Sequence, residues 1–381
     1  MELVQSANLE DKASGRIKQI DVMRGFALLG IGLENLFSMH TTNVLFAEYS
    51  ARYPHGVNHF LLLGLMVLVR GKFYPIFSFV FGASAALGLP SQGQRFFLRR
   101  LGGLFLLGAL QVLFIWEGDV LIQYACMGGL LLLLRNRSPK LLLLLGAGLL
   151  LFSFVGKLWG APGEPIPVQN VATLKSGSFL ELMAFRVQEY LQSIFTWQAL
   201  LFYARIFAFM LLGFAFVRSR KLPLLASPVR LRKCFLGHLG LVLVLVAVAQ
   251  IAGWRGESGD GFWLKEVSLG VYFYAAVVCL ASLPLLLWAM PLFQRVLSPL
   301  QVLGRLTLTH YLVQNLLFSL LFYGYGLGLF LELEPWQCVL LYGAVISVQL
   351  YFSSWLLRRY KLGPVEYSLR WIAGKKQRGA S

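Results

Sequence analysis

Charged and amide side chains interrupt a segment that is otherwise apolar enough to cross a membrane. Within residues 20–39, Asp21 precedes Arg24 by three positions, and Asn35 follows Arg24 by eleven. At about 100° per residue of an α-helix, Arg24 and Asn35 lie about 20° apart in azimuth, and Asp21 lies about 60° from Arg24. Because ionisable side chains at membrane depth are costly and usually mark functional sites, we expect this polar stripe to face other helices or a water-filled cavity.

The pair formed by Asp21 and Arg24 is suited to binding an anion. The guanidinium group of Arg24 supplies forked donors for a phosphate or an amide, and the Asp21 carboxylate would fix its orientation. The alternative is a buried ion pair that only fixes helix packing. Both interpretations require the same geometry.

Two histidines are the candidate proton acceptors. His55 and His59 are four residues apart, which places both imidazoles on one helical face. A neutral imidazole is the natural general base near pH 7. The apolar run 60–69 that follows is too short to cross a bilayer and is predicted to be a re-entrant or interfacial helix. The alternative is an interfacial histidine without a chemical role.

Further polar residues lie within later apolar segments. In the segment 304–323, three polar residues share a sector of about 60° on one helical face: Thr307, His310 and Gln314. Arg305 stands at the start of this segment, and Arg205 lies midway along another, too deep to reach either surface easily. Arg205 therefore needs an acidic or carbonyl partner, for which Glu34 and Asp21 are candidates. Such side chains either line a cavity or hydrogen-bond across helices.

Two charged clusters lie near the connections between apolar segments. Glu117 and Asp119 flank a glycine in a tight turn, where their carboxylates could orient a hydroxyl-bearing substrate or could simply be solvated. Arg95, Arg99 and Arg100 form a basic cluster that could receive the phosphates of a ligand, although the basic bias of cytoplasmic connections alone predicts such a cluster. The sequence has no nucleotide-binding glycine loop, zinc motif or serine-nucleophile elbow.

The composition indicates that a membrane surrounds these side chains. Hydrophobic residues make up 57% of the 381-residue chain, charged residues 13%, and the mean hydropathy is +0.68. No soluble globular domain of this length approaches these values, so the fold class is an all-α, polytopic helical bundle in a lipid bilayer. The ten predicted spans lie near residues 20–40, 73–89, 101–116, 120–134, 141–158, 196–217, 235–252, 266–290, 304–323 and 336–357.

The positions of the basic residues predict the orientation. A formal net charge of +17 would suggest nucleic acid in a soluble chain, but here Lys and Arg gather on alternate connections, which predicts both termini in the cytoplasm and no nucleic-acid partner. Residues 1–15 are predicted to be a disordered cytoplasmic tail. A proline-containing break at 222–228 divides a six-span portion, 16–222, from a four-span portion, 229–376. The four cysteines have no spacing suited to a metal or a disulfide.

Four motifs carry a family resemblance. They are the run from Arg16 to Gly30 with Asn35 after it, Gly71-Lys72-Phe73 with the following Phe77 to Ala83, the run from Gly304 to Gln314, and the run from Leu362 to Tyr367. Together they cover nearly the whole chain and resemble the bacterial YeiB-type membrane proteins, a family of unknown function. The wider kinship is with integral-membrane acyltransferases, including the heparan-glucosaminide acetyltransferases and the O-antigen acetylases.

The resemblance implies a multi-pass acyltransferase of the bacterial cytoplasmic membrane. It would move an acyl group from cytoplasmic acyl-coenzyme A to an envelope sugar or a small-molecule acceptor, with no bound cofactor or metal. The O-antigen acetylases carry a histidine at the position of Asn35, so His55 or His59 would have to be the base in this chain. The donor- and substrate-binding residues expected on this hypothesis are Asp21, Arg24, Asn35, Arg205, Arg305, His310 and Gln314.

Two other classes of protein fit the same residues. A transporter would use the polar stripe and Arg205 to line a substrate path, and helices broken near the midplane would favour it. The sequence shows no convincing internal repeat, which counts modestly against a transporter. In a non-catalytic membrane scaffold, the buried charges would serve packing only.

Overall fold

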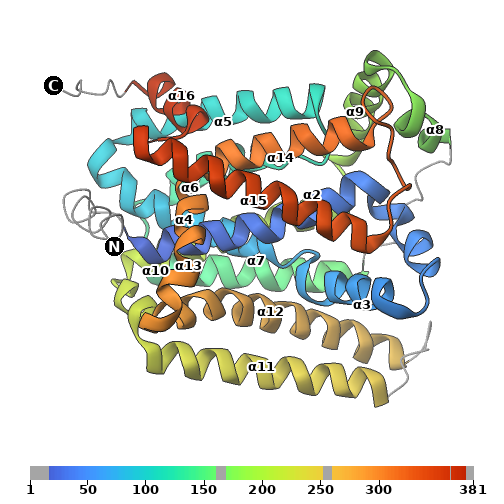
Figure 1. The fold of residues 1–381 in the computed structure, drawn as a ribbon. Coiled ribbons are helices and arrows are strands. Elements are labelled where there is room, and N and C mark those ends of the chain that lie inside the picture. Colours follow the sequence, from blue (N-terminus) through green and yellow to red (C-terminus); the bar gives the residue numbers. More distant parts are fainter. Residues whose placement is uncertain (1–16, 160–168, 252–259, 361, 375–381) are drawn as a thin grey trace.

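The computed structural model describes residues 17–159, 169–251, 260–360 and 362–374, and within these ranges the chain is helical without any β-strand. The predicted disordered tail lies outside the described residues. Long helices run side by side along one direction, whereas α13 (Pro291–Arg305) lies across them at one end (Figure 1). The all-α helical bundle predicted from the hydropathy is therefore confirmed.

The predicted spans coincide with helices of the structure. In chain order these are α2 (Lys18–Ala51), α4 (Phe73–Gln92), α5 (Gln94–Phe114), α6 (Leu121–Leu134), α7 (Pro139–Trp159), α10 (Trp197–Arg218), α11 (Pro228–Ile251), α12 (Asp260–Trp288), α14 (Thr307–Phe322) and α15 (Pro335–Arg359). Within the described ranges, eight helical segments are long and apolar enough to cross a membrane, and α6 is a shorter apolar helix of 14 residues. The predicted segment 304–323 is in fact interrupted at Leu306, where α13 ends and α14 begins.

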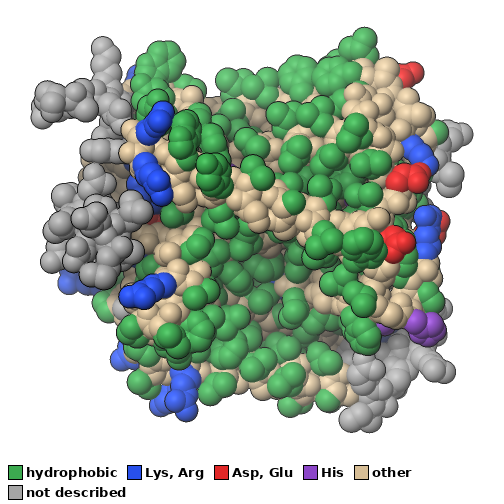
Figure 2. All heavy atoms as spheres, viewed as in Figure 1, with side chains coloured by type: hydrophobic (Ala, Val, Ile, Leu, Met, Phe, Trp, Pro, Cys, Tyr) green, Lys and Arg blue, Asp and Glu red, His purple; other side chains and the backbone are tan. Residues whose placement is uncertain are grey.

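The two ends of the bundle differ in charge. Most of the visible Lys and Arg side chains gather where α2 begins and α15 ends, and the visible Asp and Glu side chains gather at the opposite end (Figure 2). We call these the basic end and the acidic end. Between them the surface is largely apolar, with exposed side chains such as Leu106, Leu144 and Leu340, as contact with lipid requires.

A broken helical segment leads back from the acidic end. The predicted re-entrant run 60–69 lies in α3 (Gly56–Gly64) and the π-helical turn η1 (Leu65–Val69), and a break around Gly71 separates these from α4. Gly71 adopts a φ of +74°, and its N–H donates to the Glu34 carboxylate of α2 at 2.8 Å. Glu34 thus satisfies a backbone donor that the break leaves without a helical partner. The run 60–69 is the first part of this broken segment.

The crossing of α2 and α13 depends on two glycines. A Cβ atom at Gly25 would lie 1.9 Å from the carbonyl oxygen of Leu300, and a Cβ atom at Gly304 would lie 1.8 Å from the carbonyl oxygen of Asp21. Only glycine lets two helix backbones approach so closely. The glycines therefore place the first turns of α2 beside the end of α13.

Shorter helices complete the two ends of the bundle. α8 (Gln169–Ser176) and α9 (Phe179–Ser193) lie at the acidic end, and α16 (Pro364–Ile372) lies at the basic end (Figure 1). The short helix η2 (Leu222–Ala226) falls on the predicted break between the two portions of the chain.

Candidate functional site

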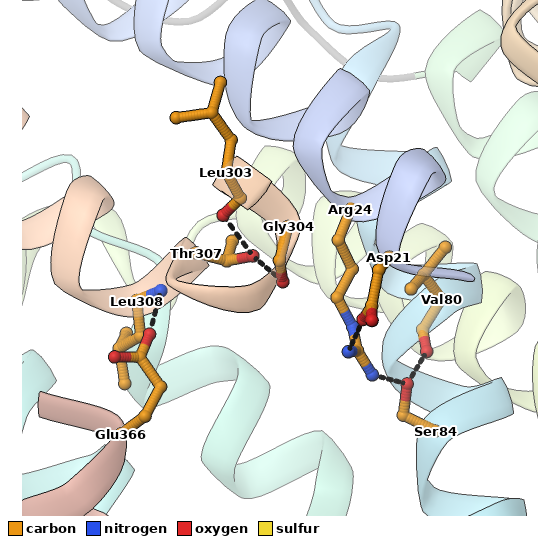
Figure 3. A network of polar contacts seen from close by, with 9 residues as sticks. All are labelled: Asp21, Arg24, Val80, Ser84, Leu303, Gly304, Thr307, Leu308 and Glu366. Carbon is orange, nitrogen blue, oxygen red and sulfur yellow. Dashed lines mark hydrogen bonds and ion pairs between the residues drawn. The ribbon is translucent and has the colours of Figure 1, made fainter. Parts of the chain in front are cut away.

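The polar stripe of α2 begins with an ion pair. Arg24 Nη1 lies 2.8 Å from Asp21 Oδ1, as the spacing of three residues on a helix allows. Arg24 Nη2 donates to the Ser84 hydroxyl of α4, which in turn donates to the Val80 carbonyl oxygen (Figure 3). The Asp21 side chain is 2% exposed and the Arg24 side chain 26%. The guanidinium group is therefore oriented by two partners and still accessible from one side.

A cavity of about 470 Å³ borders this ion pair. Ligand pockets in proteins have volumes of roughly 300–1,000 Å³, so this cavity is large enough for a substantial part of a ligand. Its charged lining consists of four arginines and two carboxylates: Arg24, Arg100, Arg305, Arg370, Asp21 and Glu366. These residues come from α2, α5, α13 and α16, which are far apart in the sequence.

The cavity extends from the basic end into the bundle. Gln92 and Arg100 line it near the basic end, whereas Leu104 and Tyr124 line it farther in. Leu104 follows Gln94, the first residue of α5, by ten residues, which corresponds to about 15 Å of helix. The cavity is therefore cationic near the basic end and mainly apolar at its inner end.

The helix α16 forms one wall of the cavity and is held by a carboxylate. Glu366 Oε1 accepts hydrogen bonds from the backbone N–H groups of Leu308 at 2.9 Å and Thr309 at 3.1 Å, and Glu366 Oε2 accepts from Thr309 Oγ1 at 2.5 Å. These N–H groups belong to the first turn of α14, where free donors and the helix dipole favour a carboxylate. Glu366 thereby fixes Leu369 and Arg370, which line the cavity.

Like charges meet inside the cavity. Arg100 lies close enough to Arg24 and Arg370 to be repelled by them, and close enough to Glu366 to be attracted. The two carboxylates are already engaged, Asp21 by Arg24 and Glu366 by the first turn of α14. Positive charge therefore predominates, and an anion with several oxygens would relieve the repulsion between the guanidinium groups.

Three of the predicted site residues belong to a separate buried layer. The hydrogen bonds of this layer join Asn35 to Asn315 (3.0 Å), Gln314 to Gln349 (2.8 Å) and His310 to Ser353 (2.5 Å). They link α2, α14 and α15, and none of these side chains lines the cavity. For His310 and Gln314 the geometry matches hydrogen bonding across helices, one of the two interpretations of this polar face, whereas Thr307 of the same face lines the cavity.

The predicted proton acceptors lie at the acidic end. His55 and His59 are exposed, and His55 directly precedes α3. Between them, Asn58 donates to Glu334 at 2.9 Å and accepts from the Trp336 N–H at 3.1 Å, which holds this turn against the start of α15. In the described part of the chain, no residue of α3 lines the cavity. The structure therefore does not bring the two histidines together with the arginines.

Arg205 also lies apart from the cavity. It is half-buried on α10, near Tyr74 and Tyr274. Among the described residues, no ion pair joins Arg205 to Glu34 or Asp21. These two candidate partners for Arg205 are therefore wrong, and a carbonyl partner stays a prediction.

The turn between α5 and α6 holds a buried carboxylate. Asp119 lies in the connection 115–120 and is 1% exposed. Its Oδ1 accepts from the Tyr311 hydroxyl at 2.6 Å, and its Oδ2 accepts from the Leu121 N–H at 2.9 Å. Burial raises the pKa of Asp119 to about 7. A solvated turn, one of the two interpretations of this motif, is therefore wrong for Asp119.

Sequence reasoning did not assign Ser84, Glu366 and Arg370 to a site. Ser84 directly follows the second family motif, and Glu366 lies within the fourth. Neither motif by itself shows that α4 and α16 converge on the start of α2. Among the described residues, no group of three or more His, Cys, Asp or Glu side chains could hold a metal ion.

The apolar helices, the charged ends and the internal cavity define a polytopic membrane protein. A family model described as "Protein of unknown function (DUF418)" matches residues 216–376, from the end of α10 to beyond α16. The chain belongs to the YeiB-like family of membrane proteins, whose domain is of unknown function.

Three relatives are similar to this chain over nearly all its length. The "Uncharacterized 39.9 kDa protein in amylase 3'region" of Bacillus acidopullulyticus is 30% identical over 374 residues, which cover 93% of each chain. YxaH of Bacillus subtilis is 29% identical over 389 residues, covering 93% of each chain. YeiB of Escherichia coli is 27% identical over 379 residues, covering 92% of this chain and 94% of YeiB. No solved structure matches the chain.

Proposed function

We propose that this protein is an acyltransferase of the bacterial cytoplasmic membrane that takes acyl-coenzyme A from the basic end, which we infer to be cytoplasmic. The observation that supports this function best is the convergence of four arginines on a cavity whose inner end is apolar. Coenzyme A is a polyanion with an uncharged arm. Its phosphates match the arginines near the basic end, and its thioester arm matches the inner end.

The partners of Arg24 support a binding role for this side chain. Asp21 and Ser84 orient the guanidinium group before any ligand arrives, so less conformational freedom is lost on binding. The inner end, about 15 Å along α5, would keep the thioester away from bulk water. Arg24 and Asp21 are thus the donor-binding residues that the family resemblance implies.

The transfer itself needs a hydroxyl or amine of the acceptor, which we take to be an envelope sugar or a small molecule. Its oxygen or nitrogen attacks the thioester carbonyl carbon, a C–O or C–N bond forms, and the C–S bond breaks. The proton lost by the acceptor passes through a base to the sulfur, so that coenzyme A leaves as a thiol. His55 and His59, predicted as this base, are exposed at the acidic end and do not line the cavity, so in this conformation they do not face the place proposed for the thioester.

Binding of the donor tests this function. Radiolabelled acetyl-coenzyme A would be titrated against the purified full chain in lipid nanodiscs. We expect saturable binding to the wild type and at least about tenfold weaker binding to Arg100→Ala, because charge-assisted hydrogen bonds contribute about 1.5–3 kcal/mol. Arg95→Ala is the matched control, since Arg95 is exposed on the same helix and does not line the cavity. A wild type without saturable binding would contradict the function.

A transporter is the second candidate, because the segment Gly56–Gln92 is broken at Gly71. Broken helices form substrate and ion sites in transporters. The break lies at the level of Glu34, about 24 Å along α2 from its first residue, Lys18, and therefore nearer the acidic end than the middle of the bundle.

Proteoliposomes separate the two candidates. A transporter would move labelled acetyl-coenzyme A across the bilayer with its thioester intact. An acyltransferase would release a free thiol when a cell-envelope extract supplies the acceptor, and would leave the donor on its original side. Transport of the intact thioester would favour the second candidate over the first.

A further inference from the structure

Asp119 lies next to the residues that form the inner end of the cavity. Leu121, two positions further along the chain, lines the cavity, and so does Leu308, which lies one helical turn before Tyr311. Asp119 accepts hydrogen bonds from the Tyr311 hydroxyl at 2.6 Å and from the Leu121 N–H at 2.9 Å. The carboxylate is therefore tied to two segments that border the space available to a ligand.

Both groups that donate to Asp119 are neutral. Among the described residues, no arginine or lysine forms an ion pair with Asp119, in contrast to the pairing of the buried Asp21 with Arg24. Neutral donors compensate a buried negative charge less well than a cation does. The folded chain therefore holds a carboxylate whose charged form is costly.

The surroundings of Asp119 contain few other titratable groups. Tyr311 of α14 and Tyr190 of α9 interact with it electrostatically, and Glu117 lies two residues away in the same connection. Neither tyrosine ionises near neutral pH in water, where the pKa of tyrosine is about 10. Burial raises the pKa of Asp119 to about 7, close to physiological pH, and it also raises the pKa of the neighbouring Glu117.

We propose that Asp119 takes up a proton when an anion occupies the cavity, so that ligand affinity depends on pH. The inference rests on the proposed function in one respect, namely that the cavity binds the phosphates of coenzyme A. A negative ligand makes the Asp119 carboxylate still less favourable in a medium of low dielectric constant. By thermodynamic reciprocity, a proton on Asp119 favours the ligand by the same factor.

Calorimetric titration of coenzyme A into the purified full chain tests the coupling. Titrations at pH 6, 7 and 8, in buffers with different ionisation enthalpies, count the protons taken up on binding. We expect the wild type to take up more protons than Asp119→Asn at pH 7. We also expect its affinity to fall about three- to tenfold more than that of Asp119→Asn between pH 6 and pH 8. Titration of the coenzyme's own phosphates is common to both proteins and cancels in this comparison.

Two further variants make the test decisive. Glu48→Gln removes a carboxylate that is 66% exposed, and it should behave like the wild type. If Asp119→Asn does not fold, Tyr311→Phe removes the hydroxyl that stabilises the Asp119 carboxylate and should shift proton uptake to higher pH. Equal proton uptake by the wild type, Asp119→Asn and Tyr311→Phe would overturn the coupling alone. Absence of coenzyme A binding at every pH would overturn both the coupling and the proposed function.

Discussion

Arg24 shows how a cation is retained inside a bundle of apolar helices. One nitrogen of its guanidinium group pairs with the Asp21 carboxylate, a second donates to the Ser84 hydroxyl, and the side chain is still accessible from the cavity. An ammonium group is a compact point charge and cannot reproduce this planar fork. The geometry of the donors, as well as their charge, therefore matters at this position.

Arg24→Lys should keep the positive charge but lose the planar, forked arrangement of hydrogen-bond donors. An ammonium group can pair with Asp21, but it cannot also reach Ser84 and a ligand with the same geometry. We expect the affinity for acetyl-coenzyme A to fall about tenfold, as the loss of one charge-assisted hydrogen bond implies. Equilibrium binding is the measurement, and Arg99→Lys, at an arginine outside the cavity lining, is the control. Equal affinity of Arg24→Lys and the wild type would mean that the fork has no role in binding.

Asp119 gives the stability of the fold a pH dependence of definite sign. Burial raises the pKa of Asp119 from its ordinary value of 3.8 to about 7. Between these values the folded chain keeps a proton that the unfolded chain has lost, so this group's contribution to stability falls as the pH rises from about 4 to about 7. Above that window the contribution is constant. The melting temperature of Asp119→Asn minus that of the wild type should therefore increase as the pH rises from about 4 to about 7. A difference between the two melting temperatures that does not change with pH would contradict the raised pKa of Asp119.

Close helix crossings place the side chains of the cavity. α2 and α13 meet through Gly25 and Gly304, and α16 is tied to the first turn of α14 through Glu366. The first contact puts the pair of Asp21 and Arg24 at one wall, and the second puts α16 at another. The first contact joins residues that are nearly three hundred positions apart in the sequence, and the second joins residues about sixty positions apart. The cavity is therefore a product of long-range packing.

Gly25→Ala should separate α2 from α13. The added Cβ atom would lie 1.9 Å from the Leu300 carbonyl oxygen, so the backbones must move apart. We expect a destabilisation of about 1–3 kcal/mol, as overpacking usually costs. Gly102→Ala on α5 is the matched control, because a Cβ atom there meets nothing within 4 Å and alanine is favoured over glycine in a helix by about 1 kcal/mol. Thermal unfolding in detergent is the measurement, and similar melting temperatures for the two variants would contradict the close crossing.

The whole molecule separates its charges between two ends. The side surface seen in Figure 2 is largely apolar, while the visible Lys and Arg side chains lie mainly at one end and the Asp and Glu side chains at the other. From the positive-inside rule we expect the basic end to face the cytoplasm. This orientation would expose the arginine-lined cavity to the compartment that contains acyl-coenzyme A.

Reporter fusions test this orientation. A reporter after Ser193, at the end of α9, should be external, whereas reporters after Arg220 and Gly374 should be cytoplasmic, because basic residues flank these two positions. The broken segment Gly56–Gln92 counts as a single crossing in this scheme. An external reporter after Gly374 would show that the number of crossings is odd.

The sequence predicts the helices and the local part of the site, but not the contacts between distant segments. Hydropathy locates the helices because each span must be apolar over its own length. The pair of Asp21 and Arg24 follows from a spacing of three residues on one helix. In contrast, the burial of Asp119 and the role of Glu366 depend on α14, which packs against both. Periodicity within one segment carries no information about such contacts.

A structure of the full chain with coenzyme A, determined by electron cryomicroscopy in lipid nanodiscs, would show whether the cavity binds the acyl donor. We expect density for the phosphates within hydrogen-bonding distance of Arg24 and Arg100, in the cavity of about 470 Å³ at the basic end. We also expect the uncharged arm to point towards Leu104 and Tyr124. An empty cavity at saturating coenzyme A, or phosphate density at the acidic end near His55, would contradict this expectation.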